Sequence, residues 1–344
     1  MIPRLQIGFS LKRQKAFLWG MEYIPQVGEY LINHARTGIV MALHAALPNS
    51  GRVGVVAYNC HTVANAVVQG GCTPVFVDVT EDLHIDLQHL ATLEVDAIVD
   101  TNLFGIRNDI EQIRQTLPNA IIIVDNAHGY GLPAEGDFTV YSINQGKFPA
   151  LGEGGVLWVN SMQYQDVIEQ QYKQLAGYSL MAEIKLYISM LLKSWMHTPL
   201  IYGLITLPMK RSRRGGACRE TVVMKRMAKG VSRMYQVALP TIDEQIQQRR
   251  THAQYIAKRW QEHGFGTQVW YGENAFMLIG RNDNPLAVKT FFAKHGVEVA
   301  THFAKTIEWA KEFGYSEGQC PMAEKLTKKL IMIPTYVDLP QLKV

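Results

Sequence analysis

The stretch from residue 53 to residue 160 alternates short runs of β-branched residues with segments of helical composition. This alternation is typical of a parallel sheet covered by helices. The runs show little apolar–polar alternation, as strands that pack on both faces require. They predict strands at residues 53–57, 74–79, 97–101, 120–125, 138–143 and 156–159.

The remainder of the chain indicates a second, smaller unit. With 344 residues and 47% hydrophobic content, the chain can form a large α/β domain and a smaller one. From residue 227 to Gly264 the sequence is strongly helical, and residues 267–300 then resemble a small α+β domain. We predict a large domain over residues 1–225 and a helical linker with a small domain over residues 226–344.

An apolar stretch lies between residues 178 and 216 and ends in the basic cluster Lys210, Arg211, Arg213 and Arg214. Charged residues and a proline divide it into pieces shorter than the ~20 apolar residues that a bilayer span needs. We therefore expect a helical excursion that packs on the domain or on a partner subunit. Contact with a membrane surface is the alternative, since apolar residues beside basic ones suit anionic interfaces.

Composition argues against several other classes of protein. A net charge of +4 with scattered basic residues does not favour nucleic acid as a partner. The four cysteines have no CxxC or zinc-ligand spacing, and the histidines have no HExxH spacing, so no metal site is expected. The N-terminal residues lack the features of a signal peptide, and we expect a cytoplasmic protein.

The most informative segment for chemistry is residues 121–160. Asp125 ends a predicted buried strand, Ser142, Asn144 and Lys147 follow the next one, and a Gly-Glu-Gly-Gly sequence leads into another. Pyridoxal phosphate (PLP) chemistry needs a lysine amine to hold the cofactor aldehyde and to move a proton. It also works best when a carboxylate keeps the pyridine nitrogen protonated. Each residue alone is commonplace, but their combination in this order predicts a PLP enzyme with Lys147 and Asp125 as catalytic residues.

A second feature lies upstream, where residues 34–47 are typical of a loop followed by a helix. Thr37 and Gly38 stand where this helix would begin, and free backbone N–H groups at a helix start can hold an anion. Taken alone, an ordinary helix cap is the simpler interpretation.

These motifs resemble the DegT/DnrJ/EryC1/StrS family of PLP-dependent sugar aminotransferases, from about residue 37 to residue 159 and more weakly to about residue 340. Asp125 and His128 are similar to the family's strand-end aspartate with a glutamine or histidine three residues on. Residues 142–147 are similar to its Ser-Phe-(His/Asn)-x-x-Lys motif, and the Gly-Glu-Gly-Gly at 152–155 is intact. Residues 57–79 resemble the segment that supplies a residue over the cofactor ring.

The resemblance implies an aspartate-aminotransferase-like fold: a three-layer αβα large domain with a mostly parallel sheet and a smaller C-terminal α+β domain. It also implies roles for a set of cofactor-binding residues. By this resemblance Asp125 pairs with the pyridine nitrogen, His128 lies beside the O3′ edge and Ser142 binds the phosphate. The remaining members of the expected cofactor site are Lys147, Asn144, Thr37, Gly38 and, at the position stacked on the ring, Cys60 or His61.

Two positions depart from the family pattern. The family commonly has an aromatic residue where Cys60 stands, so stacking could shift to His61. An asparagine that reaches the partner's cofactor phosphate in many members aligns with Met224, and Lys225 or Arg226 could replace that contact.

The resemblance implies an aminotransferase that moves an amino group from a donor such as glutamate to the keto sugar of a nucleotide-linked sugar, as in polysaccharide biosynthesis. A homodimer is implied as well. Other PLP-dependent chemistry is one alternative, but in similar sugar dehydratases a histidine replaces the lysine that is retained here. A non-catalytic regulatory or scaffold relative is another. Candidates for holding a substrate diphosphate or carboxylate are Arg211, Arg213, Arg214 and His302.

Overall fold

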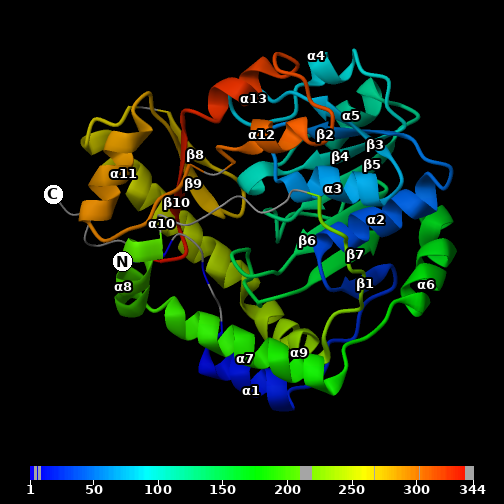
Figure 1. Cartoon of the computed structure of the whole chain (residues 1–344), viewed down its shortest axis with the longest axis horizontal. Coiled ribbons are helices and arrows are strands. Elements are labelled where there is room, and N and C mark those ends of the chain that lie inside the picture. Colours follow the sequence, from blue (N-terminus) through cyan, green and yellow to red (C-terminus); the bar gives the residue numbers. More distant parts are fainter. Residues whose placement is uncertain (4–5, 7–8, 210–218, 267, 302, 338–344) are drawn as a thin grey trace.

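The computed structural model describes residues 1–337 apart from 4–5, 7–8, 210–218, 267 and 302 (Figure 1). At its centre is a seven-stranded sheet with the order β1-β7-β6-β5-β4-β2-β3. Strands β2 to β6 are parallel, and β7 is antiparallel to both of its neighbours. The strands are β1 (Glu29–Ile32), β2 (Arg52–Val56), β3 (Thr73–Val77), β4 (Ala97–Thr101), β5 (Ile121–Asn126), β6 (Phe138–Ser142) and β7 (Gly155–Val159).

Helices cover both faces of this sheet. On β5, Ile122 and Val124 point into one hydrophobic core, whereas Ile123 points into the other, because successive side chains of a strand face opposite sides. Helices α2, α3 and α6 pack in the second core, and α1, α4, α5, α9 and the start of α10 pack in the first. The expected three-layer αβα fold with a mostly parallel sheet is therefore confirmed.

The helices of the described residues have the following bounds: α1 (Leu11–Trp19), α2 (Ala35–Ala46), α3 (His61–Gln69), α4 (Leu87–Leu90), α5 (Ile110–Thr116), α6 (Gln165–Gln174), α7 (Leu180–Met196), α8 (Pro199–Met209), α9 (Lys229–Ala238), α10 (Ile242–Glu262), α11 (Pro285–Lys294), α12 (Thr306–Lys311) and α13 (Pro321–Leu326). Short 3-10 helices occupy Leu103–Gly105, Met162–Tyr164 and Leu239–Thr241.

A second, antiparallel sheet has the order β10-β9-β8. Its strands are β8 (Val269–Tyr271), β9 (Met277–Arg281) and β10 (Leu330–Pro334), and α10 and α11 pack against it around the buried Trp260 and Phe292. Residues 297–300 contribute isolated bridges instead of a full strand.

The C-terminal part of the chain also returns to the large sheet. The carboxylate of Asp78, which follows β3, accepts hydrogen bonds from the backbone N–H groups of Met322 (2.9 Å) and Ala323 (2.7 Å) at the start of α13. Helix α12 likewise lies beside α3 (Figure 1).

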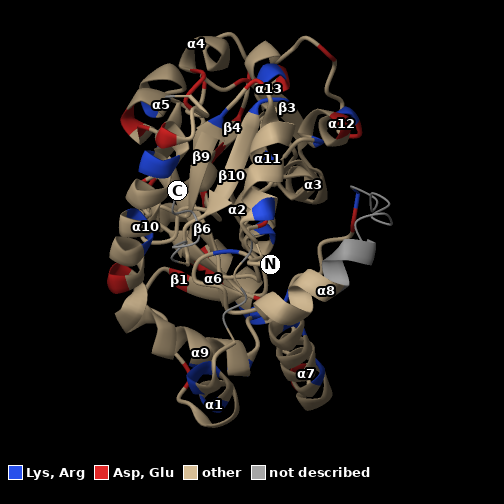
Figure 2. Ribbon diagram, turned by 90° about the vertical axis from the view of Figure 1, so that its left-hand side faces the viewer, with Lys and Arg blue, Asp and Glu red and all other residues tan. Residues whose placement is uncertain are grey.

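Helices α7 and α8 occupy the apolar stretch for which the sequence predicts a helical excursion. They lie at the edge of the molecule (Figure 2), and α7 packs on α9 and on the loop at Gly152, which contacts Met190. No helix among the described residues is long and apolar enough to cross a membrane. Arg211, Arg213, Arg214 and His302, the candidates for substrate binding, lie outside the described residues.

Candidate functional site

A cavity of about 240 Å³ lies at the carboxyl ends of β2, β4, β5 and β6, beside the start of α2. Ligands of open α/β sheets bind in the crevice outside the carboxyl ends of the strands. The cavity brings together six of the residues selected from the sequence: Cys60, Asp125, His128, Ser142, Asn144 and Lys147. Thr37, Gly38 and His61 do not line it.

Asp125 is buried near the end of β5, directly opposite Thr101 on β4. One carboxylate oxygen accepts a hydrogen bond from the backbone N–H of Ala127 (2.9 Å), and the other accepts one from the Thr101 hydroxyl (3.4 Å). The Asn59 side chain donates in turn to the Thr101 hydroxyl (2.8 Å). These neighbours fix the direction of the carboxylate towards the cavity.

Lys147 lies in the loop that joins β6 to β7. Its backbone N–H donates to the carbonyl of Asn144 (3.0 Å), and Gly146 before it has a φ of +79°, a conformation that favours glycine. Within the described part of the chain, no side chain or carbonyl accepts a hydrogen bond from the Lys147 ammonium. The amine is thus carried by a hydrogen-bonded loop and has no hydrogen bond to the described residues.

Burial governs the electrostatics of this pair. Burial lowers the pKa of Lys147, while the charges of Cys60 and Asp125 oppose the shift. Burial also raises the pKa of Asp125, against the effects of its hydrogen bond from Ala127 and the charge of Lys147. The lysine therefore loses its charge, and the aspartate gains a proton, more easily than each would in water. Such shifts suit an amine that exchanges protons and a carboxylate that can pair with a cation.

Asn144 ties the glycine-rich loop to the start of α2. Its side-chain oxygen accepts a hydrogen bond from the backbone N–H of Gly154 (2.8 Å), and its amide nitrogen lies 3.1 Å from Nδ1 of His34. Burial and the charge of Arg36 lower the pKa of His34 to about 4, so its ring is neutral at pH 7 and Nδ1 can accept this hydrogen bond. Asn144 thus links two segments of the cavity wall, the glycine-rich loop and the start of α2.

The helix α2 begins two residues earlier than the sequence analysis expects, at Ala35. The backbone N–H of Thr37 already donates to the carbonyl of His34 (3.0 Å), and Gly38 packs against Val140 of the sheet. The His34 side chain does not cap the helix, so the N–H groups of Ala35 and Arg36 are the first without an intrahelical acceptor. Ala35 and Arg36 line the cavity wall and Thr37 and Gly38 do not, and the anion-binding role expected of Thr37 and Gly38 stays a prediction.

Arg36 is a cavity residue that the sequence analysis missed. Its Nε is buried and has no hydrogen-bond partner in the described part of the chain. A buried donor without an acceptor costs free energy, and a guanidinium matches the geometry of phosphate and carboxylate groups. The sequence did contain an indication of this residue, since Arg36 is adjacent to Thr37 at the same helix start.

His128 stacks in an aromatic cluster at the other wall. Its ring lies 4.8 Å from that of Phe276 and 5.1 Å from that of Phe104, nearly parallel to both. Its Nδ1 accepts a hydrogen bond from the backbone N–H of Phe104 (3.3 Å), which places the ring proton on Nε2. Phe303 lines the cavity and also stacks on His128, and both Phe104 and Phe303 have a φ of +55°. Such strained backbone at non-glycine residues is concentrated at functional sites.

The structure distinguishes the two candidates for the position over the cofactor ring, Cys60 and His61, because only one of them lies at the cavity. Cys60 lines the cavity, whereas the His61 ring packs edge-on against Trp309 at 4.9 Å. Burial opposes ionisation of the Cys60 thiol, but hydrogen bonds from His61 and Thr62 and the charge of Lys147 together lower its pKa to about 7.

Met224, Lys225 and Arg226, the positions considered for a contact across a dimer, are all engaged within the chain. Met224 packs against the core under α2 and α3. The Lys225 ammonium lies 4.9 Å from the centre of the Tyr178 ring, and Arg226 Nε donates to the carbonyl of Leu175 (3.0 Å).

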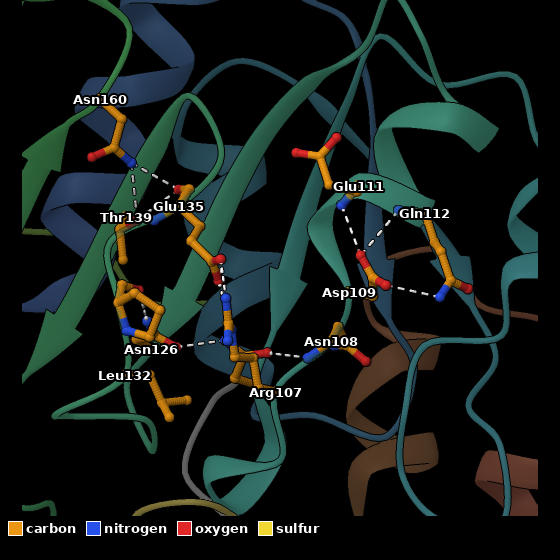
Figure 3. A network of polar contacts seen from close by, with 12 residues as sticks. Arg107, Asn108, Asp109, Glu111, Gln112, Asn126, Leu132, Glu135, Thr139 and Asn160 are labelled. Carbon is orange, nitrogen blue, oxygen red and sulfur yellow. Dashed lines mark hydrogen bonds and ion pairs between the residues drawn. The ribbon is translucent and has the colours of Figure 1, made fainter.

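A second cavity, of about 540 Å³, is lined by charged residues of which three, Arg107, Asp109 and Glu135, already have partners (Figure 3). Arg107 forms an ion pair with Glu135, and Asp109 caps α5 by accepting hydrogen bonds from the N–H groups of Glu111 (3.0 Å) and Gln112 (3.2 Å). Its charges stabilise local structure, in contrast to Arg36 and Lys147. Within the described ranges, no cluster of His, Cys, Asp or Glu could hold a metal ion.

The fold is that of the aminotransferases. The chain resembles the crystal structure of the sugar aminotransferase CalS13 from Micromonospora echinospora with a TM-score of 0.70, over 97% of this chain and 95% of that one, at 16% sequence identity. It also resembles an E. coli GDP-4-keto-6-deoxy-D-mannose-3-dehydratase with bound hydrated PLP, with a TM-score of 0.71 at 15% identity, over 98% and 96% of the two chains.

Sequence similarity assigns the chain to a particular family. Residues 31–344 match the model of the DegT/DnrJ/EryC1/StrS aminotransferase family, and the chain belongs to this family. It is 28% identical over 174 residues to dTDP-4-amino-4,6-dideoxy-D-glucose transaminase of Shigella dysenteriae, a match that covers 47% of this chain and 46% of the relative. The E. coli enzyme of the same name is 30% identical over 112 residues, 31% of this chain and 30% of that one. The chain thus spans less than half of the length of these relatives.

Proposed function

We propose that this chain is a PLP-dependent aminotransferase. The observation that carries the proposal is the cavity itself, whose wall at the strand ends contains both the buried carboxylate of Asp125 and Lys147, an amine without a hydrogen bond to the described residues. Membership of the DegT/DnrJ/EryC1/StrS aminotransferase family supports the same chemistry.

The donors around the cavity fit PLP. The phosphate would be held by the first N–H groups of α2 at Ala35 and Arg36, by the Arg36 guanidinium and by the Ser142 hydroxyl. Asp125 would hold the protonated ring nitrogen, and Lys147 would hold the aldehyde. Bound in this way, the cofactor supplies an aldehyde that exchanges amines and a ring that accepts electrons from the substrate.

The chain's own residues would perform the proton transfers. Lys147, with a pKa lowered by burial, would remove the proton from the α-carbon of the amino donor and return one to the product. Asp125, with its neighbour Thr101, would keep the ring nitrogen charged. The cluster of His128, Phe104 and Phe303 would exclude water from that side.

We infer that the acceptor is a nucleotide-linked keto sugar and that glutamate serves as the amino donor. The support is that two relatives are dTDP-4-amino-4,6-dideoxy-D-glucose transaminases. We also expect a homodimer. The strongly exposed apolar side chains of Trp19, the last residue of α1, and of Met21 and Ile24, which follow it, support a homodimer, because monomers rarely expose large apolar patches.

Transfer of isotopically labelled nitrogen tests the activity. The protein is incubated with PLP, labelled glutamate and a dTDP-linked 4-keto-6-deoxy sugar, and the sugar product is examined by mass spectrometry. Appearance of the label in an amino sugar, and its loss in Lys147→Ala, is the expected result. Loss of a sugar hydroxyl without label would indicate a dehydratase, and no reaction with any amino donor or keto sugar would favour a non-catalytic relative.

A further inference from the structure

Helix α7 exposes an apolar stripe, and exposed apolar side chains follow on α8. On α7 the exposed residues recur every three to four positions, so they share one face of the helix. Ile188 is 49% exposed and Trp195 is 62% exposed, which is far more than a helix in a protein core would allow. The stripe consists of Met181, Ile184, Ile188, Leu191, Leu192 and Trp195 on α7, and it is continued by Leu200 and Leu204 on α8.

The opposite face of α7 is fixed to the protein. Met190 is buried against Gly152, and the Tyr187 ring contacts that of Phe17 on α1 at 5.3 Å. The Glu183 carboxylate accepts hydrogen bonds from the first N–H groups of α9, at Lys229 (2.9 Å) and Gly230 (3.2 Å). The helix therefore cannot turn its stripe inward without losing these contacts.

The segment that carries the stripe has nearly all of its charge of one sign. Glu183 is the single acidic residue between positions 180 and 218 in the sequence. Its carboxylate already accepts hydrogen bonds from the start of α9. Lys185, which borders the stripe, and Lys193 are both exposed, and α8 carries no charged residue (Figure 2). The sequence that follows α8 adds four more Lys and Arg residues before position 215.

We propose that α7 and α8 form a membrane-binding element that lies in the surface of an anionic lipid bilayer. A one-sided apolar stripe with a Trp residue and basic neighbours is what such interfaces bind. A second copy of the chain is a poorer partner for the stripe. A symmetric contact would bring the exposed Lys185 and Lys193 of each copy to the same interface, and this segment offers them no acidic residue other than Glu183, which already accepts hydrogen bonds from α9. The proposal is independent of the amino-transfer activity.

Vesicle binding tests the proposal with the whole chain of 344 residues. The protein is centrifuged with vesicles of phosphatidylcholine alone or of phosphatidylcholine with phosphatidylglycerol, at low and high salt. We expect binding to the anionic vesicles that weakens with salt. The double variant Ile188→Glu/Leu192→Glu should bind at least about tenfold more weakly, because two apolar side chains no longer enter the lipid.

Leu286→Glu is the matched control, since Leu286 on α11 is 73% exposed outside the stripe. This variant should bind vesicles like the wild type, and circular dichroism should show that all variants are folded. Absence of binding to the anionic vesicles would overturn the proposal. Conversion of an oligomer to a monomer by Ile188→Glu/Leu192→Glu, measured by light scattering without lipid, would also overturn it and would assign the stripe to a second copy.

Discussion

Arg36 brings a buried Nε to the cavity and has no acceptor for it within the described chain. If it binds the cofactor phosphate, Arg36→Ala should weaken PLP affinity about 10- to 100-fold, as expected for the loss of hydrogen bonds between charged groups. A PLP titration followed by absorbance measures the change. Arg107→Ala, which removes an arginine already paired with Glu135, is the control and should leave the affinity unchanged. Equal affinity of Arg36→Ala and wild type would remove Arg36 from the phosphate site.

The Cys60 thiol offers a probe of charge in the same cavity. Its pKa of about 7 lies below the ordinary 9.0, and thiolate is the reactive form, so alkylation in PLP-free protein should reach half of its maximal rate near pH 7. Lys147→Ala should move this midpoint to higher pH, because one of the charges that stabilises the thiolate is lost. Peptide mass spectrometry distinguishes Cys60 from Cys72, whose pKa is raised by burial. A wild-type midpoint near 9 would show that the cavity does not stabilise a thiolate.

At the scale of elements, the cavity depends on the close packing of β7 against the start of α2. A Cβ atom at Gly155 would lie 2.5 Å from the backbone nitrogen of Ala35. Gly155→Ala should therefore lower the free energy of unfolding by roughly 1–3 kcal/mol, the usual cost of overpacking, and should weaken PLP binding as well. Urea unfolding measures the first effect. Gly177→Ala, at an open position, should change neither quantity, and a Gly155→Ala protein with wild-type stability would contradict the account.

Most elements of the large sheet could be predicted from the sequence, because buried parallel strands form apolar runs that stand out against their helical neighbours. β1 did not stand out, since its four residues begin with Glu29 and its identity depends on pairing with β7. The start of α2 was misplaced by two residues because His34 provides no side-chain cap. Phe303 reaches the cavity from a segment without any local motif, so only the tertiary fold could reveal it.

At the scale of the whole molecule, one buried carboxylate links stability to pH. Asp100 on β4 is fully buried, with one oxygen bonded to Asn108 and the other without a partner in the described structure. Burial raises its pKa from 3.8 to about 7, so the folded protein retains a proton that the unfolded chain releases. The contribution of Asp100 to the free energy of unfolding should therefore fall as the pH rises from about 4 to about 7 and then level off.

Asp100→Asn should remove this contribution while keeping an acceptor for Asn108. Urea unfolding at a series of pH values should show a flatter profile for the variant between pH 4 and 7, and the exposed Asp82→Asn should follow the wild type. Parallel profiles for wild type and Asp100→Asn would mean that Asp100 is ionised in the folded protein throughout this range.

The central claim is that Lys147 is the residue that holds PLP. Borohydride reduction of the protein with PLP, followed by digestion and mass spectrometry, locates any lysine that has bound the cofactor covalently. We predict the added mass on the peptide that contains Lys147, its absence in Lys147→Ala, and its loss when glutamate is added before the reduction. Cofactor mass on another lysine, or on none, would contradict the account.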